Sequence, residues 1–270
     1  MIEEILRLGI RHVELGYDLT MDLVPGVMKM AREKAVSVDS LHNFCPVPVG
    51  VPSGSPELFH LTGLDPRNRE SAVRYTSKTV DFAAEIGARV VVVHAGNVDM
   101  PYRTGDLLTL REKGEQYSPH YEKIKMKLLM KRDSKVKKHL DSLDRSLEEI
   151  LPLLSQTGVR LALENLPAWE SIPTEAEMEA ILKRYDSPWI GYWHDIGHGQ
   201  IRQNLGFISY KLWLDRLAGR LAGLHIHDVA PPAQDHLMPP RGKVDFRGFK
   251  MYLKSDMALV LEPAPRTPEA

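Results

Sequence analysis

Gly191-Tyr192-Trp193-His194-Asp195-Ile196-Gly197-His198 is the stretch that decides the fold. In it an apolar, aromatic run stops at an aspartate, and a histidine follows three residues later. Aspartate is depleted in strands, so its place at the end of such a run needs a reason. If the run is a buried strand, Gly197 allows a tight turn, and Asp195 and His198 can converge on one point. A carboxylate and an imidazole together suit a divalent transition metal. The alternative is an aspartate that caps the next turn beside an unrelated surface histidine.

The same arrangement recurs along the chain, where apolar runs end in a histidine or an acidic residue. These terminal residues are Glu14, His42, His94, Glu164, Asp195, His225 and Glu262. His225 and His227 are two residues apart in one run, so in a strand both would point to the same side. The carboxyl ends of barrel strands form a single rim where active sites lie, and we expect these side chains to meet there.

Strand-like runs alternate with segments of helical spacing, which predicts parallel βα units. We expect strands over residues 10–15, 36–44, 89–93, 159–166, 189–195, 221–228 and 258–261. We expect helices over residues 1–8, 21–35, 69–86, 120–155, 174–185, 207–217 and 246–253. Residues 97–119 read as irregular, and the Pro/Gly-rich segment 45–66 reads as a lid or binding loop.

Seven strands can be counted, whereas a (β/α)8 barrel has eight. The pattern shows no strand before Met1 and no helix after Glu262. We therefore predict one α/β domain over residues 1–270, a (β/α)8-type TIM barrel that lacks the first strand and the closing helix. The seam would then be open, covered by a partner, or closed in a longer version of the chain.

Composition narrows the class of protein. A chain of 270 residues with 43% hydrophobic and 26% charged residues can build one large core. Its 35 basic and 36 acidic residues create no global field that would attract nucleic acid or a membrane. The lone Cys45 excludes an internal disulfide and fits a reducing compartment. No apolar run approaches the roughly 20 residues of a membrane span, and Glu3 and Glu4 interrupt any signal peptide. We expect a cytoplasmic protein.

The first half of the long predicted helix is basic. Its charged residues are Lys123, Lys125, Lys127, Lys131, Arg132, Lys135, Lys137 and Lys138, against Asp133. We interpret this run as a solvated helix face, and the alternative is a patch for phosphate or nucleic acid.

Taken together, these motifs resemble the xylose isomerase-like TIM-barrel superfamily, which holds sugar-phosphate isomerases and epimerases and the endonuclease IV enzymes. The matching pieces are His94-Ala95-Gly96, Leu163-Glu164-Asn165, His194-Asp195-Ile196-Gly197-His198, His225-Ile226-His227-Asp228, Asp235-His236-Leu237, Gly242-Lys243-Val244-Asp245-Phe246 and Leu261-Glu262. Their order and strand placement are jointly specific. The family normally begins with the strand that this chain lacks.

The resemblance implies a divalent metal (Mn, Co, Mg or Zn) held by three carboxylates and one imidazole. The implied ligands are Glu164, Asp195, His225 and Glu262. His227 replaces His225 as the ligand if the register is shifted by one pair.

The resemblance also implies residues that bind substrate or further metal ions. The substrate-binding candidates are His198, Glu170, His94, His42, His227 and Arg241, of which Arg241 would contact a phosphate. The candidates for a second metal are His94, His198 and His236. His42, His94 and His227 have the alternative of being hydrogen-bonded structural histidines. Gln234 stands where the endonucleases have an aspartate, which argues against a full trinuclear site.

We predict a metal-dependent sugar or sugar-phosphate isomerase or epimerase, with a small-molecule sugar as its partner and a homo-oligomer as a compatible assembly. Glu164 and Glu262 would act as the catalytic pair, one removing a proton next to a carbonyl and the other returning it through a metal-stabilised enediolate. One alternative is an endonuclease IV-like phosphodiesterase acting on abasic DNA, against which stand the balanced charge and Gln234. The other is a non-catalytic sugar-binding barrel, against which stand the intact Glu164 and Glu262.

Overall fold

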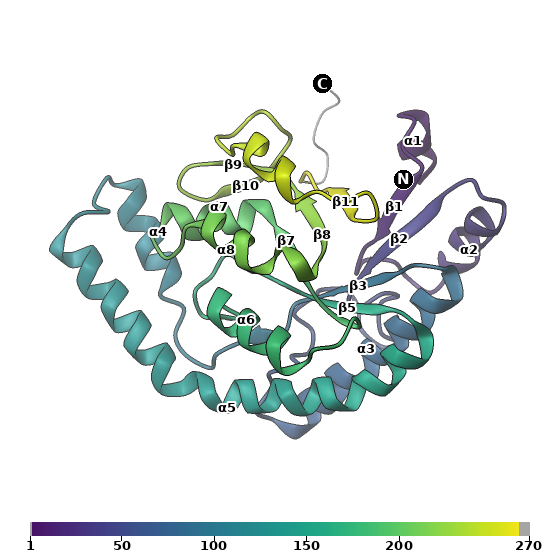
Figure 1. The fold of residues 1–270 in the computed structure, drawn as a ribbon, viewed down its shortest axis with the longest axis horizontal. Helices are drawn as coiled ribbons and strands as arrows, with labels where there is room; N and C mark the ends of the chain where they lie inside the picture. The colour runs from purple at the N-terminus through teal and green to yellow at the C-terminus, as the bar shows by residue number, and fades with distance from the viewer. Residues whose placement is uncertain (1, 265–270) are drawn as a thin grey trace.

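Seven parallel strands form the centre of the structure, a computed structural model that describes residues 2–264 (Figure 1). The strands are β1 (His12–Leu15), β2 (Ser37–His42), β3 (Val90–Val93), β5 (Arg160–Glu164), β7 (Ile190–Asp195), β8 (Leu221–Ile226) and β11 (Ala258–Leu261). They pair in the order β1-β2-β3-β5-β7-β8-β11, and every pair is parallel. Helices connect the strands, so the chain folds as a nearly closed TIM barrel, as predicted.

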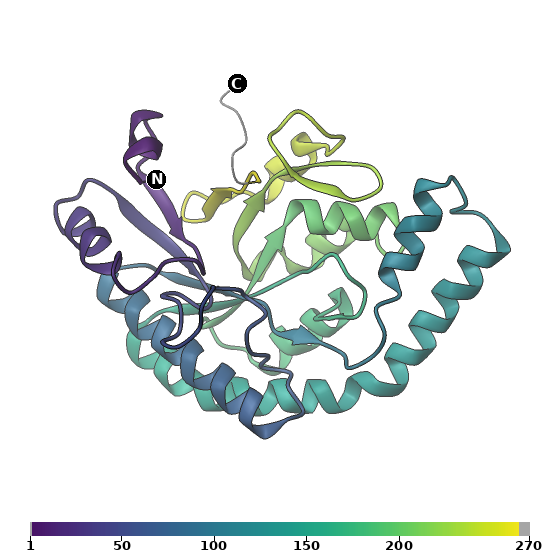
Figure 2. The same cartoon turned by 180° about the vertical axis from the view of Figure 1, so that it is seen from behind.

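Helices surround the strands on the outside (Figures 1 and 2). They are α1 (Ile2–Arg7), α2 (Val24–Arg32), α3 (Pro66–Ile86), α4 (Thr104–Glu112), α5 (Pro119–Thr157), α6 (Glu175–Arg184), α7 (Ile196–Asn204) and α8 (Tyr210–Leu217), with the 3-10 turns η1 (Ala218–Arg220) and η2 (Phe246–Tyr252). Two short antiparallel ladders join loops: β4 (Gly96–Asn97) with β6 (Ser171–Ile172), and β9 (Asp228–Ala230) with β10 (Gln234–Leu237). No helix in the described part of the chain combines the length and apolarity that crossing a membrane requires.

The barrel has a seam between β1 and β11. Within residues 2–264, β1 pairs only with β2 and β11 pairs only with β8. Leu259 and Leu261 of β11 are about half exposed there. The prediction that the sheet has seven strands is confirmed. The prediction that no helix follows Glu262 falls mostly on residues 265–270, which lie outside the described residues.

The strands are buried on both faces, which explains their continuous apolar runs. All four residues of β3 and all six of β7 are buried. Outward side chains such as Val91 and Leu161 pack in the large core beneath the helices. Inward side chains form a second, smaller cluster, in which Val92, Ala162 and Trp193 lie together. Because strand side chains alternate, the residue two positions after each of these inward residues also points inward, at the rim of the barrel.

Two helices differ from the sequence expectations. Residues 97–119, expected to be irregular, contain α4, whose buried residues are only Thr104, Leu107 and Leu110 and therefore give little periodic signal. The tight turn expected at Gly197 is wrong, because Gly197 lies in the first turn of α7. A Cβ on Gly197 would lie 1.9 Å from the ring of His227, so this glycine permits a close packing rather than a turn.

We expect Gly223→Ala to destabilise the barrel by about 1–3 kcal/mol, the usual range for overpacking a core. Trp193 pairs with Gly223 across β7 and β8, and a Cβ at Gly223 would lie 2.2 Å from the buried indole ring. Gly219→Ala is the matched control, because nothing lies within 4 Å of its Cβ position. Urea unfolding monitored by circular dichroism measures both variants. Equal stability of the two would contradict this account of the barrel interior.

Candidate metal centre and active site

Four strands deliver four potential metal ligands to one point at the carboxyl end of the barrel. The Nδ1 atom of His225 lies 3.2 Å from a carboxylate oxygen of Glu164 and 3.3 Å from one of Glu262. The nearest oxygen of Asp195 is 3.8 Å from the same nitrogen. Glu164, Asp195 and His225 are buried, and Glu262 is the member with solvent access. The structure therefore brings together the four residues that the sequence predicts as metal ligands.

The charges of this cluster fit a cation. Burial disfavours an ionised carboxylate, but the neighbouring imidazoles outweigh it and hold the pKa values of Glu164 and Asp195 below their ordinary range. Burial likewise disfavours an imidazolium, yet Glu14 and Glu164 raise the pKa of His225 well above its usual value. One buried oxygen of Glu164, Oε2, accepts no hydrogen bond within the described residues. A buried carboxylate with an oxygen that accepts no hydrogen bond, in a group with two further carboxylates, is the environment that a divalent cation stabilises.

A carboxylate on β1 orients the histidine of this cluster. Oε1 of Glu14 lies 2.9 Å from Nε2 of His225, and Ser40 donates a hydrogen bond of 2.6 Å to the other oxygen. When the imidazolium loses one proton, these partners hold the remaining proton of His225 on Nε2, so that the Nδ1 lone pair faces the cluster. Metal-binding histidines commonly donate their second N–H to a carboxylate in this way. From the sequence, Glu14 is predicted at the rim without a role.

His227 orients Asp195 through a hydrogen bond. The Nδ1 atom of His227 accepts the backbone N–H of His236 at 2.9 Å, so its Nε2 carries the proton and donates to Asp195 Oδ1 at 3.0 Å. The same oxygen accepts the backbone N–H of His198 at 2.6 Å. Both ring nitrogens of His227 are thus engaged, although His198, His227 and His236 offer donor atoms within 4.8 Å of one another. We therefore assign His227 a positioning role, in preference to the alternative that it replaces His225 as a ligand.

A second pair of imidazoles faces the other oxygen of Glu164. The Nε2 atoms of His42 and His94 lie 3.3 Å and 3.2 Å from Glu164 Oε2. His94 also binds Glu57 through Nδ1 at 2.7 Å, and Glu57 in turn contacts His60. Burial opposes charge on His94, but Glu164 and Glu57 outweigh it and raise the pKa of His94 to about 10. Glu57 belongs to the predicted lid or binding loop, and the sequence offered no signal for its pairing.

The predicted second-metal set is not assembled as one group. The rings of His198 and His236 lie 6.0 Å apart, together with His227. No compact group of donors in residues 2–264 joins His94 to either of them. His94 instead meets Glu164 at Oε2, whereas His198 approaches Oε1 at 3.6 Å. The geometry therefore separates these three histidines into two neighbourhoods.

Glu170 and Arg241 lie outside the cluster. Glu170 is buried, and its carboxylate accepts the backbone N–H groups of Arg103 and Thr104 and the hydroxyl of Thr104. These bonds fix the start of α4. Arg241 is exposed in the loop between β10 and η2. Their contact with a substrate stays a prediction.

Asn165 ties the two central strands of the site together. Its side-chain amide accepts the backbone N–H of Asp195 at 2.8 Å and donates to the backbone oxygen of Asp195 at 2.9 Å. Its own backbone oxygen lies 3.0 Å from Nδ1 of His198. That contact places the His198 proton on Nδ1 and leaves Nε2 as a lone pair. The residue after Glu164 therefore sets the orientation of both Asp195 and His198.

We expect Glu14→Gln to weaken Mn²⁺ or Zn²⁺ binding about tenfold or more, the usual effect of removing a carboxylate behind a histidine ligand. The amide cannot hold the Nε2 proton of His225 as strongly as the carboxylate does. Isothermal titration calorimetry measures the affinity. Ser40→Ala is the control, because it removes one hydrogen bond to Glu14 and keeps the carboxylate. An unchanged affinity in Glu14→Gln would show that His225 does not need this support.

We also expect the metal affinity to rise with pH between about pH 6 and about pH 8. The raised pKa of His225 means that its imidazole is protonated in the metal-free protein at neutral pH, so a cation must displace that proton. Each binding event should then release about one proton. Titrations in buffers of different ionisation enthalpy report this release. An affinity independent of pH would contradict the assignment of His225 as a ligand.

Comparison with known proteins shows the family to which this chain belongs. The family model for the xylose isomerase-like TIM barrel matches residues 2–268. The uncharacterised protein MJ1614 of Methanocaldococcus jannaschii is 23% identical over 258 residues, which cover 95% of this chain and 82% of that protein. Among solved structures, a D-tagatose 3-epimerase-like protein has a TM-score of 0.69 at 20% identity, with 97% of this chain and 85% of that chain covered. The 3-keto-D-glucoside 4-epimerase YcjR of E. coli has a TM-score of 0.68 at 17% identity, with 99% and 87% covered. IolI with bound zinc has a TM-score of 0.66 at 14% identity, with 98% and 83% covered. The chain belongs to the xylose isomerase-like TIM-barrel family.

Proposed function

We propose that this protein is a divalent-metal-dependent epimerase or isomerase of a sugar or sugar phosphate. The observation that carries the proposal is the convergence of Glu164, Asp195 and Glu262 on the Nδ1 atom of His225 at the rim of the barrel. The printed names of several structural neighbours, a tagatose 3-epimerase-like protein and a 3-keto-glucoside 4-epimerase among them, support the same chemistry.

A cation held by Glu164, Asp195, His225 and Glu262 would supply an electrophile that stabilises negative charge developing on an oxygen beside the reacting carbon. The chain's own residues would move the proton. Glu164 and Glu262 reach the cluster from β5 and from the end of β11, so they are suited to opposite faces of a bound sugar. One removes the proton next to the carbonyl, and the other returns it. Return to the opposite face of the same carbon is epimerisation, whereas return to the neighbouring carbon is isomerisation.

The imidazoles around Glu164 suit two further tasks of such a reaction, the transfer of a proton to solvent and the binding of sugar hydroxyl groups. His94 bridges Glu164 to Glu57, which is partly exposed, and so offers a route for a proton between the buried carboxylate and solvent. His198 and His42 would bind hydroxyl groups of the sugar from either side of Glu164. An imidazole can donate a hydrogen bond to a hydroxyl group or accept one from it, which makes histidine a suitable sugar ligand.

A phosphodiesterase of the endonuclease IV type is the second candidate, because His42, Glu164 and His225 offer donor atoms within 4.8 Å of one another, an arrangement that would suit a further ion. Gln234 argues against it, since the amide is a poorer ligand than the aspartate that the resemblance would require. Elemental analysis of the purified protein separates the two functions. One tightly held ion per chain favours the sugar enzyme, and three favour the phosphodiesterase.

We expect Glu164→Gln to lower proton exchange by a factor of about a hundred to ten thousand, the range for a missing general base, and to weaken metal binding. Incorporation of solvent deuterium into a panel of ketoses and ketose phosphates measures the exchange. The combined change Lys135→Gln, Lys137→Gln and Lys138→Gln is the control, and it should leave metal content and exchange unchanged. Persistent exchange in Glu164→Gln would show that another group is the base. A metal-loaded wild-type protein that exchanges no ketose would favour the sugar-binding alternative.

A further inference from the structure

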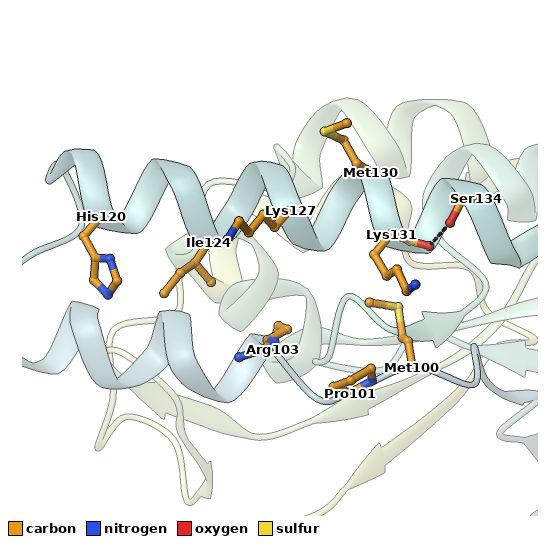
Figure 3. A pocket seen from close by; sticks show the side chains of 9 residues that line it. All are labelled: Met100, Pro101, Arg103, His120, Ile124, Lys127, Met130, Lys131 and Ser134. Carbon is orange, nitrogen blue, oxygen red and sulfur yellow. Dashed lines mark hydrogen bonds between the residues drawn. The ribbon is translucent and has the colours of Figure 1, made fainter.

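A groove of about 650 Å³ lies outside the barrel, between the first half of α5 and the segment that leads into α4 (Figure 3). None of its lining residues belongs to the carboxylate and imidazole cluster, and none carries a carboxylate. Positions 120, 124, 127, 131 and 134 of α5 line it, and their spacing of three and four residues places them on one stripe of the helix. The neighbouring stripe, which includes Tyr121, Leu128 and Arg132, is buried against the protein.

Two lysines in the groove have no counter-ion. Within residues 2–264, the ammonium groups of Lys127 and Lys131 take part in no hydrogen bond or ion pair. Several other cations of the same half-helix have partners: Lys125 and Lys135 donate to backbone carbonyl groups, and Arg132 pairs with a partly buried carboxylate. Lys127 and Lys131 are exposed, and they are the unpaired lysines of the basic run that line the groove.

Lys127 and Lys131 lie beside apolar surface. Met100 and Pro101 form the wall opposite α5, and Ile124 adds an apolar side chain from the helix (Figure 3). Figure 3 also shows Lys131 extending from α5 toward Met100, with Arg103 farther along the facing segment. Arg103 is already paired with a neighbouring aspartate at 2.9 Å, so the two lysines supply the free charge. Concave apolar surface with a few charged groups is the usual composition of a small-molecule site.

We propose that this groove binds a phosphorylated small molecule with an aromatic or aliphatic body. Two ammonium groups one helical turn apart suit a phosphate, because lysine binds phosphate as a point charge without a fixed geometry. Met100 and Ile124 suit the body of the ligand, since a thioether packs well against a ring. The volume of the groove falls in the range of drug-sized ligand sites, about 300–1,000 Å³.

The groove and the rim of the barrel share one segment of chain. Residues 96–103 follow β3 and His94, pair with β6 through β4, and supply Met100, Pro101 and Arg103 to the groove. The backbone N–H of Arg103 also holds Glu170. A ligand in the groove would therefore restrain the segment that connects Glu170 to His94, which would make the groove a regulatory site for the barrel.

The test uses 1-naphthyl phosphate, a fluorescent molecule that has both a phosphate and an aromatic body. We expect saturable binding by fluorescence and calorimetry, and weaker binding of 1-naphthol and of inorganic phosphate, each of which lacks one half. Lys127→Ala with Lys131→Ala should weaken binding about tenfold or more. Lys123→Ala with Lys138→Ala is the matched control, because it removes the same charge from the same helix outside the groove and should leave binding unchanged.

Three results would overturn the proposal. Equal weakening in both double variants would mean that only the overall charge of α5 matters. Loss of binding in Glu164→Gln would place the ligand at the barrel mouth. Tighter binding of a DNA oligonucleotide, abolished by Lys127→Ala with Lys131→Ala, would assign the same lysines to a nucleic-acid surface. The experiment measures no turnover, so its outcome is independent of the proposed function.

Discussion

The pairing of buried carboxylates with the imidazole of His225 is the interaction on which the site depends. Glu164 and Asp195 are almost fully removed from water, and each would lose its charge by burial alone. The imidazoles of His225 and His94 lower the pKa of Glu164, and those of His198 and His227 lower the pKa of Asp195. Glu14 fixes the direction in which the ring of His225 points. A cation held by these residues would take over the same task in place of the proton. The barrel supplies the low-dielectric setting that makes the exchange of one positive charge for another energetically large.

The alternation of strand side chains carried most of the site prediction. Residues such as Glu164 and Asp195 could be placed at the rim because each ends an apolar run, and the family resemblance gave their shared role. The pairing of Glu14 with His225 could not be found in this way, because it joins residues 211 positions apart and depends on how the sheet curves. The contact of Glu57 with His94 could not be predicted either, since Glu57 lies in a loop and no periodic pattern describes a loop.

The helices show a similar division. The helices predicted over residues 120–155 and 174–185 match α5 and α6 to within a few residues; α5 buries an apolar stripe and α6 begins with a capping box. In contrast, α4 buries three side chains and α7 contains Gly197 and Gly199, so neither carries a helical signal that the sequence could reveal. The different surroundings of His225 and His227 were also hidden, because the two histidines are two positions apart in one predicted strand and on one predicted face. Their partners distinguish them: Glu14 faces Nε2 of His225, whereas the backbone N–H of His236 donates to Nδ1 of His227.

The gap between β1 and β11 is spanned by side chains. Glu14 on one edge strand and Glu262 beyond the other both reach His225, through its two different ring nitrogens. One imidazole thus fastens two sheet edges that no backbone ladder joins in the described part of the chain. Separation of these edges would pull the donor atoms apart and weaken the binding of an ion. By thermodynamic linkage, a bound ion would oppose the separation by the same free energy. Opening of the seam between β1 and β11 and release of the ion would then be two sides of one coupled equilibrium.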